Sequence, residues 1–466
     1  MTQHHFDPSI LRAYDIRGRF GDTLNVRDAD YLGRSFGTRV LRAGGQKVTV
    51  CRDGRLSSPE LTQALIAGLR STGIDVIDIG CGPTPLLYYS VFSLEADGGI
   101  MVTGSHNPIE DNGFKLLLGK NALHGAQITA LGELAAHGDF RHGQGKYQNI
   151  DLRERYLNRL LQDVDLKLLA EKGFKIGWDP GHGAAAEMVT RLVERLPGTH
   201  YVINGEIDGT FPAHHPDPTI PENLMQLQTL MQEKQLDLGF AFDGDGDRIG
   251  VVDREGGIIW GDHIISLLAE DILQRTPGAT IIADVKSSQV TFNRIAELGG
   301  KPLMWKTGHS LIKEKMRETG ALLGGELSGH IYIKDQFYGY DDAIYVALRL
   351  LNVFAGHKTN MQVLLATYPH QVSTPEIRLF CDEKRKFIII EEVLSRLNST
   401  THEVSTIDGM RVSSAQGWWL LRPSNTQAAL VVRCEAASPD KLNLVIAHLN
   451  YHLGLSGLAP IVHSIG

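Results

Sequence analysis

The sequence lacks the features that mark several large protein classes. It contains four cysteines in 466 residues, scattered and without a Cys-x-x-Cys pair, which excludes a disulfide scaffold and favours reduced thiols. No apolar run reaches the roughly 18 residues of a membrane-spanning helix, and the N-terminus lacks the basic-then-apolar pattern of a signal peptide. We therefore expect a cytoplasmic protein that makes no contact with a membrane.

Positive charge is also scarce. The 46 Lys and Arg residues are outnumbered by 54 Asp and Glu residues, the formal net charge is -8, and no basic run stands out. This balance argues against a nucleic-acid groove or an anionic membrane surface as partner. Any phosphate group that the protein binds must be held by a local site.

What the sequence does contain suits a large α/β enzyme. A chain of 466 residues exceeds what one hydrophobic core supports, so we expect three or four domains. Hydrophobic residues make up 42% of the chain, enough for several cores. The 50 glycines exceed the usual share of about 7% and suit junctions at which a strand passes into a loop.

A strand, an aspartate and a helix follow one another at three places. Apolar patterns predict strands over residues 47–52, 174–178 and 280–283, and each strand is followed by an aspartate and a helical pattern. In the first case the predicted helix has Ser58 as N-cap and ends near Gly73. Because these three strand-aspartate-helix segments lie about one domain length apart, they predict three tandem doubly wound α/β domains of related topology.

The last part of the chain has a different pattern. From about Ser373, strands are predicted over residues 376–380, 417–421 and 429–434, with a helix over residues 387–397 and another at the end. This indicates a smaller α+β domain. The expected domain limits are 1–150, 151–253, 254–369 and 370–466.

The loop Thr103-Gly104-Ser105-His106-Asn107-Pro108 directly follows a strand predicted over residues 99–102. A serine at a strand end is a candidate nucleophile, although these residue types also form ordinary turns. The sequence has no Gly-x-Ser-x-Gly elbow and suggests no Ser-His-Asp triad, so serine hydrolase chemistry has little support. The interpretation that this serine carries a phosphoryl group stays open.

A second loop, Asp243-Gly244-Asp245-Gly246-Asp247-Arg248, follows the strand predicted over residues 238–242. At about 5 Å and an effective dielectric of about 20, each carboxylate pair would repel by roughly 3 kcal/mol, a cost that a divalent cation removes. Hard oxygen ligands suit Mg²⁺. An EF-hand is excluded by Arg248 and Arg254 at its glycine and glutamate positions, whereas a phosphatase with Asp243 as nucleophile has Asp247 where threonine is usual.

Two further loops carry groups that can bind a phosphosugar. Glu326 and Ser328 lie two residues apart in a glycine-rich segment, so both face one pocket if the segment is extended. The segment Arg422-Pro423-Ser424-Asn425-Thr426 offers a guanidinium, hydroxyls, an amide and backbone N–H groups, the donors that a phosphate dianion needs. Ordinary surface turns are the alternative for both.

In this order, on a chain of this length, the four loops resemble the α-D-phosphohexomutase family, and within it the bacterial phosphomannomutase/phosphoglucomutase group. The resemblance implies four domains around a central cleft, with Ser105 as phosphoserine. By the same resemblance Ser105 also joins Asp243, Asp245 and Asp247 in holding one Mg²⁺, Glu326 and Ser328 hold the sugar, and Arg422, Ser424, Asn425 and Thr426 hold the distal phosphate.

Further family positions are matched along the chain. The segments Tyr14-Asp15-Ile16-Arg17, Asn112-Gly113-Phe114-Lys115 and Thr307-Gly308-His309-Ser310 fit the family pattern, as do Arg248 and Lys286. The resemblance implies catalytic roles for Arg17, Lys115, His309 and His330, and substrate binding by Tyr14, Arg248 and Lys286.

The function implied by the resemblance is interconversion of hexose 6-phosphate and hexose 1-phosphate, for mannose and/or glucose. It proceeds through a phosphoserine and a bisphosphorylated sugar, with glucose 1,6-bisphosphate as priming activator, in a monomer. One alternative is a phosphoglucosamine mutase. By the family resemblance, such an enzyme has Glu-Gln-Ser in the sugar-binding loop and alanine in the serine loop, whereas this chain has Leu327 and Gly104 at these positions. The other is a non-catalytic sugar-phosphate-binding protein.

Overall fold

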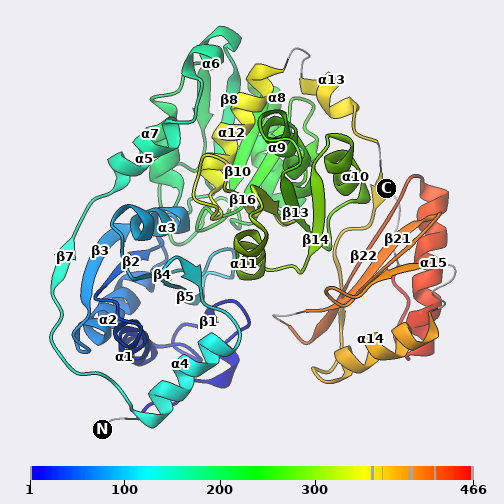
Figure 1. The fold of residues 1–466 in the computed structure, drawn as a ribbon. Coiled ribbons are helices and arrows are strands. Elements are labelled where there is room, and N and C mark those ends of the chain that lie inside the picture. Colours follow the sequence, from blue (N-terminus) through cyan, green and yellow to red (C-terminus); the bar gives the residue numbers. More distant parts are fainter. Residues whose placement is uncertain (1–2, 358–360, 370, 398–401, 425–426, 463–466) are drawn as a thin grey trace.

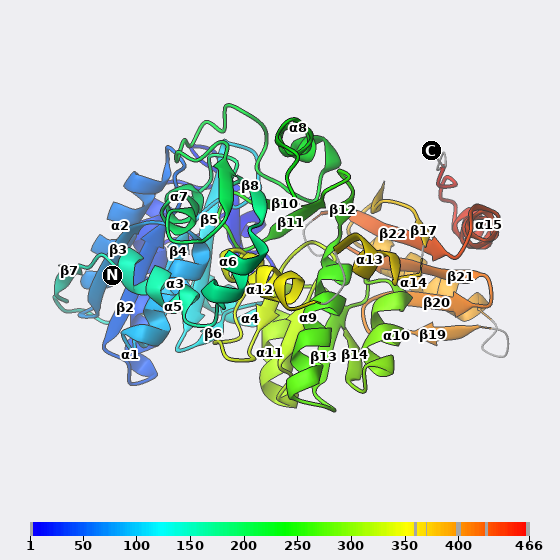
Figure 2. The same cartoon turned by 90° about the horizontal axis from the view of Figure 1, so that it is seen from above.

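The computed structural model describes residues 3–357, 361–369, 371–397, 402–424 and 427–462. Within these residues the strands form four sheets that follow one another along the chain. Figure 1 shows three α/β units, from blue to yellow, with the orange and red C-terminal unit beside the third. The view from above places the N-terminal unit and the C-terminal unit at opposite ends of the molecule (Figure 2).

The first unit has a short 3-10 helix, η1 (Pro8–Ile10), and a mixed sheet of order β1-β5-β4-β2-β3-β7, with β6 paired to β5. Its strands are β1 (Ile16–Arg19), β2 (Lys47–Arg52), β3 (Asp75–Cys81), β4 (Gly98–Val102), β5 (Asp111–Leu118), β6 (Asn121–Ala122) and β7 (Tyr147–Asn149). Its helices are α1 (Val26–Arg42), α2 (Ser58–Arg70), α3 (Thr84–Ser93) and α4 (Ala126–His137).

The second unit has a sheet of order β12-β11-β10-β8-β9. Its strands are β8 (Lys175–Asp179), β9 (Thr199–Val202), β10 (Leu238–Phe242), β11 (Ile249–Asp253) and β12 (Ile258–Ile259). Its helices are α5 (Arg153–Leu161), α6 (Leu166–Lys172), α7 (Ala186–Val193), η2 (Pro221–Leu224) and α8 (Met225–Lys234). The expected limit at residue 253 falls before β12, which pairs with β11 and carries this sheet on to Ile259.

The third unit has a sheet of order β14-β13-β15-β16, made of β13 (Thr280–Asp284), β14 (Lys301–Trp305), β15 (Leu323–Gly325) and β16 (Ile331–Ile333). Its helices are α9 (Gly261–Arg275), α10 (Gln289–Glu297), α11 (His309–Thr319), α12 (Ala343–Gly356) and α13 (Met361–Ala366).

The fourth unit is an antiparallel sheet of order β17-β22-β21-β20-β19, with β18 also paired to β22. Its strands are β17 (Val372–Ser373), β18 (Ile377–Phe380), β19 (Glu403–Ser405), β20 (Met410–Ser414), β21 (Gly417–Pro423) and β22 (Ala429–Ala436). Helices α14 (Arg385–Arg396) and α15 (Pro439–Leu455) complete it. The expected fold class, three α/β domains and a smaller α+β domain, is confirmed.

The first three sheets share one topology. Each contains four neighbouring strands that, numbered in chain order within this group, lie in the order second, first, third, fourth. These are β3-β2-β4-β5, β9-β8-β10-β11 and β14-β13-β15-β16. The first three strands are parallel and the fourth runs antiparallel to the third. The turn between the third and fourth strands therefore has the same position in each unit, at the carboxyl end of the parallel strands.

The α/β units share core packing, whereas the fourth unit has a core of its own. One continuous apolar cluster includes Tyr88 of α3, Trp178 of β8 and Leu348 of α12, which lie in three different units. The fourth unit buries Trp419 and Leu449 in a separate cluster. It meets the third unit at Arg411, which donates to the carbonyls of Val285 and Ser287 at 2.9 and 2.7 Å.

The structure corrects the sequence analysis at helix α2. The helix ends at Arg70 rather than near Gly73, and Ser57, not Ser58, precedes its first residue. The Ser58 hydroxyl is not free to cap the helix, because it donates to Asp53 Oδ1 at the end of β2. A contact from outside the helix therefore replaces the expected local cap.

The four cysteines are free, with Cys51 and Cys434 buried and Cys81 and Cys381 partly exposed. None of the described helices combines the length and apolar character needed to cross a membrane.

The crossing of α1 and α2 gives the first testable prediction. A β-carbon at Gly68 would lie 2.0 Å from the carbonyl oxygen of Asp30, so Gly68→Ala forces the two helices apart. We expect a loss of about 1–3 kcal/mol in unfolding free energy, the usual cost of overpacking. Gly454→Ala in α15 is the control, because a β-carbon there meets nothing within 4 Å and alanine favours a helix by up to about 1 kcal/mol.

Unfolding midpoints from scanning calorimetry would test this pair of variants. Equal midpoints for Gly68→Ala and Gly454→Ala would show that the α1 and α2 helices can separate at no cost, contrary to the packing argument.

Candidate active site

The predicted functional loops meet at one cleft of about 1120 Å³. Three of them are the equivalent turns between the third and fourth strands of the α/β sheets: β4 to β5, β10 to β11 and β15 to β16. The fourth begins in the last residues of β21 in the C-terminal unit, and its residues Arg422 and Ser424 also line the cleft. Side chains from all four units therefore surround the same space.

Ser105 lies at the bottom of this cleft and is 2% exposed. Its φ angle is +47°, a left-handed conformation that is uncommon for serine. In this conformation the hydroxyl donates to Asp243 Oδ2 at 2.9 Å and lies 3.1 Å from His106 Nδ1. The first unit thus presents a serine oxygen directly to the acidic turn of the second unit.

The acidic turn gathers buried carboxylates, as its sequence predicts. Asp243, Asp245 and Asp247 are each 0% exposed, and one oxygen from each lies within 4.8 Å of the others. Lys115 of β5 donates to Asp245 Oδ2 at 2.6 Å and also to Asp247 Oδ2. The Thr84 hydroxyl donates to Asp245 as well.

Burial and mutual repulsion set the ionisation of this cluster. Burial, followed by the charges of Asp245 and Asp247, raises the pKa of Asp243 well above its ordinary value. Burial and Asp245 raise the pKa of Asp247. Burial also opposes ionisation of Asp245, but the charge and hydrogen bond of Lys115, together with the Thr84 hydrogen bond, outweigh it and lower the pKa of that carboxyl. One ammonium group therefore does not hold all three carboxyls in the ionised form, and full ionisation of the cluster requires further positive charge.

The residues present fit a magnesium ion. Asp245 Oδ1 and Asp247 Oδ1 are buried and have no hydrogen-bond partner among the described residues. Carboxylate and hydroxyl oxygens of this kind are the ligands that Mg²⁺ prefers, with positions left for phosphate oxygens or water. Asp243 and the Ser105 hydroxyl lie beside them, so all four predicted metal ligands are close together.

Two arginines flank the serine and the aspartates. Arg17 donates to the carbonyl of Thr103 at 2.9 Å, at the start of the serine loop, and its second amino group pairs with Asp15. Arg248 donates through Nε to His330 Nε2 at 2.9 Å. Both arginines line the cleft, as predicted.

The two predicted histidines have different environments. His330 Nδ1 lies 3.0 Å from Asp341 Oδ2, and Lys313 donates to the other Asp341 oxygen at 2.8 Å. Because His330 Nε2 accepts from Arg248, we assign the proton to Nδ1. In His309, burial, followed by the charge of Lys313, holds the pKa well below its ordinary value, so the ring is neutral at pH 7. The ring of Tyr14 lies 6.1 Å from that of His309.

Glu326 and Ser328 both line the cleft, but not in the conformation that the sequence suggested. The segment is a turn rather than an extended stretch: Gly329 N donates to the carbonyl of Glu326 at 3.0 Å. Gly329 has φ +89°, which glycine adopts without strain and which reverses the chain. Glu326 accepts from Tyr332 at 2.7 Å, which fixes its carboxylate.

The predicted phosphate-binding cations are paired with carboxylates. Lys286 Nζ lies 3.3 Å from Glu376, and Arg422 Nε donates to Asp408 Oδ2 at 2.9 Å. The Lys286 charge lowers the pKa of Glu376 to about 2. Ser424 is held by its carbonyl, which accepts from Lys386 at 2.7 Å. The predicted residues Asn425 and Thr426 lie outside the described residues.

Sequence reasoning did not single out several residues of this site. Asp341 lies beside His330, Glu376 pairs with Lys286, and Arg55 donates to the serine loop. Their partners lie 11 to 90 residues away in the chain. The one available signal was the Asp53-Gly54-Arg55 segment after a buried strand, a position at which polar side chains reach a ligand.

Comparison with known families covers nearly the whole chain. The matches are to phosphoglucomutase/phosphomannomutase, with alpha/beta/alpha domain I over residues 8–141, domain II over 154–257, domain III over 260–371 and the C-terminal domain over 376–449. Each match contains one of the four loops described above.

Individual relatives agree with these matches. The chain is 44% identical over 437 residues to a phosphomannomutase/phosphoglucomutase of Pseudomonas aeruginosa, with 94% of each chain covered. It is 39% identical over 431 residues to a phosphoglucomutase of Neisseria gonorrhoeae, covering 92% of this chain and 93% of the other. A solved phosphoglucomutase/phosphomannomutase family protein from Burkholderia thailandensis superposes with a TM-score of 0.92 and 42% identity, covering 98% of this chain and 100% of the other.

The pairing of Lys115 with the acidic turn gives a second prediction. Lys115→Met leaves Asp245 and Asp247 buried without their ammonium partner, so unfolding free energy at pH 7 in EDTA should fall by about 3–5 kcal/mol. Added Mg²⁺ should restore part of it, because a cation that binds only the native state stabilises that state. Urea unfolding with and without Mg²⁺ measures both effects.

Lys301→Met, at an exposed position, serves as the control, and its stability should stay within about 0.5 kcal/mol of the unmodified chain. An unchanged Lys115→Met variant, insensitive to Mg²⁺, would contradict the view that the acidic turn needs positive charge.

Proposed function

The chain belongs to the phosphoglucomutase/phosphomannomutase family, and from that premise we propose that it interconverts hexose 6-phosphate and hexose 1-phosphate through a phosphoserine at Ser105. The single observation that carries the proposal is the Ser105 hydroxyl, 2.9 Å from Asp243 in a cleft lined by cationic side chains. A phosphoryl group on this oxygen would lie between the acidic turn and the space that the sugar enters.

We propose that Asp243, Asp245, Asp247 and Ser105 hold one Mg²⁺ per chain. When bound, the ion neutralises the carboxylates and polarises the phosphoryl group on Ser105. The buried carboxylate oxygens without a hydrogen-bond partner among the described residues support this assignment.

In the proposed reaction a sugar hydroxyl attacks the phosphorus on Ser105 and loses its proton. The bond from phosphorus to the serine oxygen breaks, that oxygen takes up one proton to become a hydroxyl again, and a bisphosphorylated sugar forms. We propose that His309 accepts the hydroxyl proton, since burial lowers its pKa and so leaves a ring nitrogen unprotonated at pH 7. Lys115 and Arg17 are cationic side chains near the serine loop. They would stabilise the negative charge that develops on the oxygens of the transferred phosphoryl group.

The bisphosphorylated sugar must then turn so that its other phosphate reaches Ser105. Glu326 and Ser328 can bind sugar hydroxyls, while Lys286, Arg422 and Ser424 can bind the distal phosphate. Tyr14, Arg248 and His330 also line the cleft. The cleft volume of about 1120 Å³ leaves room for the bisphosphorylated sugar to reorient without being released.

Further parts of the proposal rest on the relatives and on composition. The names of the Pseudomonas and Neisseria relatives support glucose and mannose phosphates as substrates, and glucose 1,6-bisphosphate would prime Ser105. The net charge of -8 supports an enzyme that binds neither nucleic acid nor an anionic membrane surface, and we also propose that it is cytoplasmic and monomeric. The proposed domains are 1–150, 151–259, 260–369 and 370–466, with the second limit placed after β12.

Ser105→Ala tests the proposed function directly. With no other group at this position to carry phosphate, turnover of mannose 1-phosphate and glucose 1-phosphate should fall more than about 100-fold, or about 2.7 kcal/mol in the barrier. Intact mass should show one phosphate on the unmodified chain, removable by phosphatase and absent from the variant. Ser395→Ala, at an exposed site in α14, should behave like the unmodified chain. Undiminished turnover by Ser105→Ala would refute the assignment.

Arg422→Ala tests the phosphate loop. Loss of a charge-assisted contact of about 1.5–3 kcal/mol should lower kcat/KM about tenfold to hundredfold. Because the same loop would retain the intermediate as it turns, the glucose 1,6-bisphosphate concentration for half-maximal rate should also rise. Arg396→Ala removes a guanidinium that bonds within the same unit to His452 and Ser456, and should change neither quantity. If both quantities stay within about twofold for Arg422→Ala, the loop is only a turn.

A further inference from the structure

The serine loop is held in an unfavourable conformation by contacts from outside it. Ser105 has φ +47°. Within the loop, Asn107 N donates to the carbonyl of Gly104 at 2.9 Å, and Ser105 N donates to the Thr103 hydroxyl at 2.8 Å. A non-glycine residue in the left-handed region persists only when its surroundings fix it. The groups that fix this loop therefore decide where the Ser105 hydroxyl points.

Arg55 makes the largest set of these contacts. Arg55 lies in the loop between β2 and α2 and is 1% exposed. Through Nη2 it donates to the carbonyls of Ser105 and Asn107, both at 2.7 Å. Through Nη1 it donates to the carbonyls of Pro108 and Asp111, at 2.6 and 2.9 Å. One guanidinium thus binds carbonyls along the whole loop, from Ser105 to the first residue of β5.

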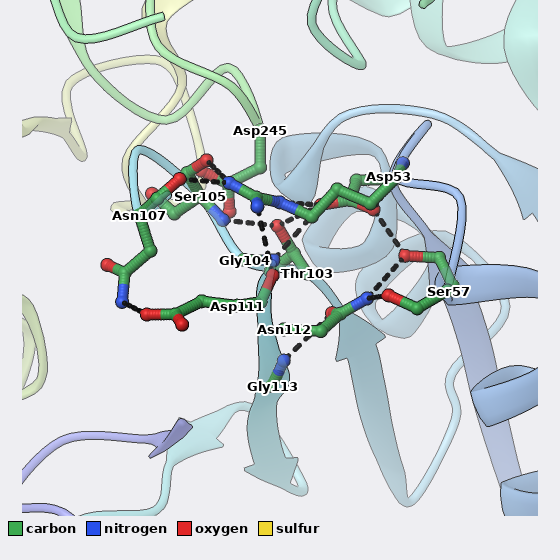
Figure 3. Close-up of polar contacts among 12 residues, drawn as sticks. Asp53, Ser57, Thr103, Gly104, Ser105, Asn107, Asp111, Asn112, Gly113 and Asp245 are labelled. Carbon is green, nitrogen blue, oxygen red and sulfur yellow. Dashed lines mark hydrogen bonds and ion pairs between the residues drawn. The ribbon is translucent and has the colours of Figure 1, made fainter. Parts of the chain in front are cut away.

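Asp53 holds the other side of the same loop, as Figure 3 shows. Its Oδ2 accepts from the Thr103 hydroxyl at 2.7 Å and from Gly104 N at 3.1 Å. The two side chains are complementary: Asp53 accepts from donors before Ser105, and Arg55 donates to acceptors from Ser105 onward. Gly104 fits closely between them, since a β-carbon there would lie 2.2 Å from Arg55 Nε.

The second unit covers the outer face of this arrangement. The ring of Phe211 lies 5.3 Å from the Arg55 guanidinium carbon, at cation–π distance. Beside it the backbones touch closely: a β-carbon at Gly209 would lie 2.4 Å from the carbonyl of Gly54. Arg55 is therefore enclosed by the unit that also carries Asp243, the partner of the Ser105 hydroxyl.

We propose that Arg55 is a positioning residue for phosphoryl transfer at Ser105, an inference that rests on the function proposed above. It lies behind the loop rather than in the lining of the cleft, so it acts on the substrate only through the placement of Ser105. A lysine keeps the charge but lacks the planar fork that binds four carbonyls at once. Substitution should therefore affect kcat rather than KM.

Arg55→Lys is the principal variant. We expect kcat to fall about tenfold to hundredfold, the effect of a small misplacement of a reacting group, with KM within about twofold. Hydrogen exchange of the peptide spanning residues 104–111 should become faster, because the loop loses carbonyl contacts. Arg349→Lys is the matched control: Arg349 is 2% exposed and donates to Asp335, Tyr345 and Asp271, away from the serine loop. It should leave loop exchange and kcat unchanged.

Phe211→Leu keeps Arg55 but removes the ring beneath it, and should speed loop exchange in the same direction. It keeps the test decisive if circular dichroism shows that Arg55→Lys does not fold. Unchanged loop exchange in the folded variants, or a raised KM with unaltered kcat in Arg55→Lys, overturns the proposal. Hydrogen exchange is measured without substrate, so it tests the role of Arg55 independently of the proposed function. Absence of phosphate on Ser105 in the unmodified chain would refute the proposed function, whereas unchanged loop exchange would refute the role of Arg55.

Discussion

The burial of three carboxylates against one ammonium group is the constraint on which the rest of the site depends. Asp243, Asp245 and Asp247 come from one turn of the second unit, whereas Lys115 comes from β5 of the first. Unpaired buried carboxylates are costly, so the two units must dock in the orientation that brings Lys115 to the turn. The same orientation places the Ser105 hydroxyl 2.9 Å from Asp243. Satisfying buried charge and assembling the reacting groups are thus one event.

The repeated topology explains how one framework supplies three different chemistries. In each α/β unit the turn after the third strand faces the cleft, and the end of the first strand carries an aspartate. Asp53 accepts from the N–H of Gly104, and Asp284 accepts from the N–H of Leu327 at 3.2 Å. In these two units the first-strand aspartate fixes the functional turn. The turn sequences then decide whether a unit offers a serine, a cluster of carboxylates or the groups proposed to bind the sugar.

Most of the fold and the centre of the site could be predicted from the sequence, because they depend on local patterns. Apolar runs define the buried strands, and Ser105 and Asp243 stand at strand ends where polar groups reach a ligand. What was missed depends on contacts between distant segments. Ser58 bonds to Asp53 instead of capping α2, and Asp341 acquires its role only when β16 brings His330 to it. No periodicity in the sequence encodes such pairings.

The cations that would bind phosphate are already paired with carboxylates, and this affects how tightly a substrate can be held. Lys286 faces Glu376, and Arg422 faces Asp408. An entering phosphate replaces one anion with another, so the affinity is the difference between two ion pairings rather than the full value of the new one. A bisphosphorylated sugar that must turn within the cleft benefits from this exchange. In the proposed mechanism, a phosphate that leaves Lys286 or Arg422 lets the carboxylate beside that cation pair with it again, which would lower the barrier to reorientation.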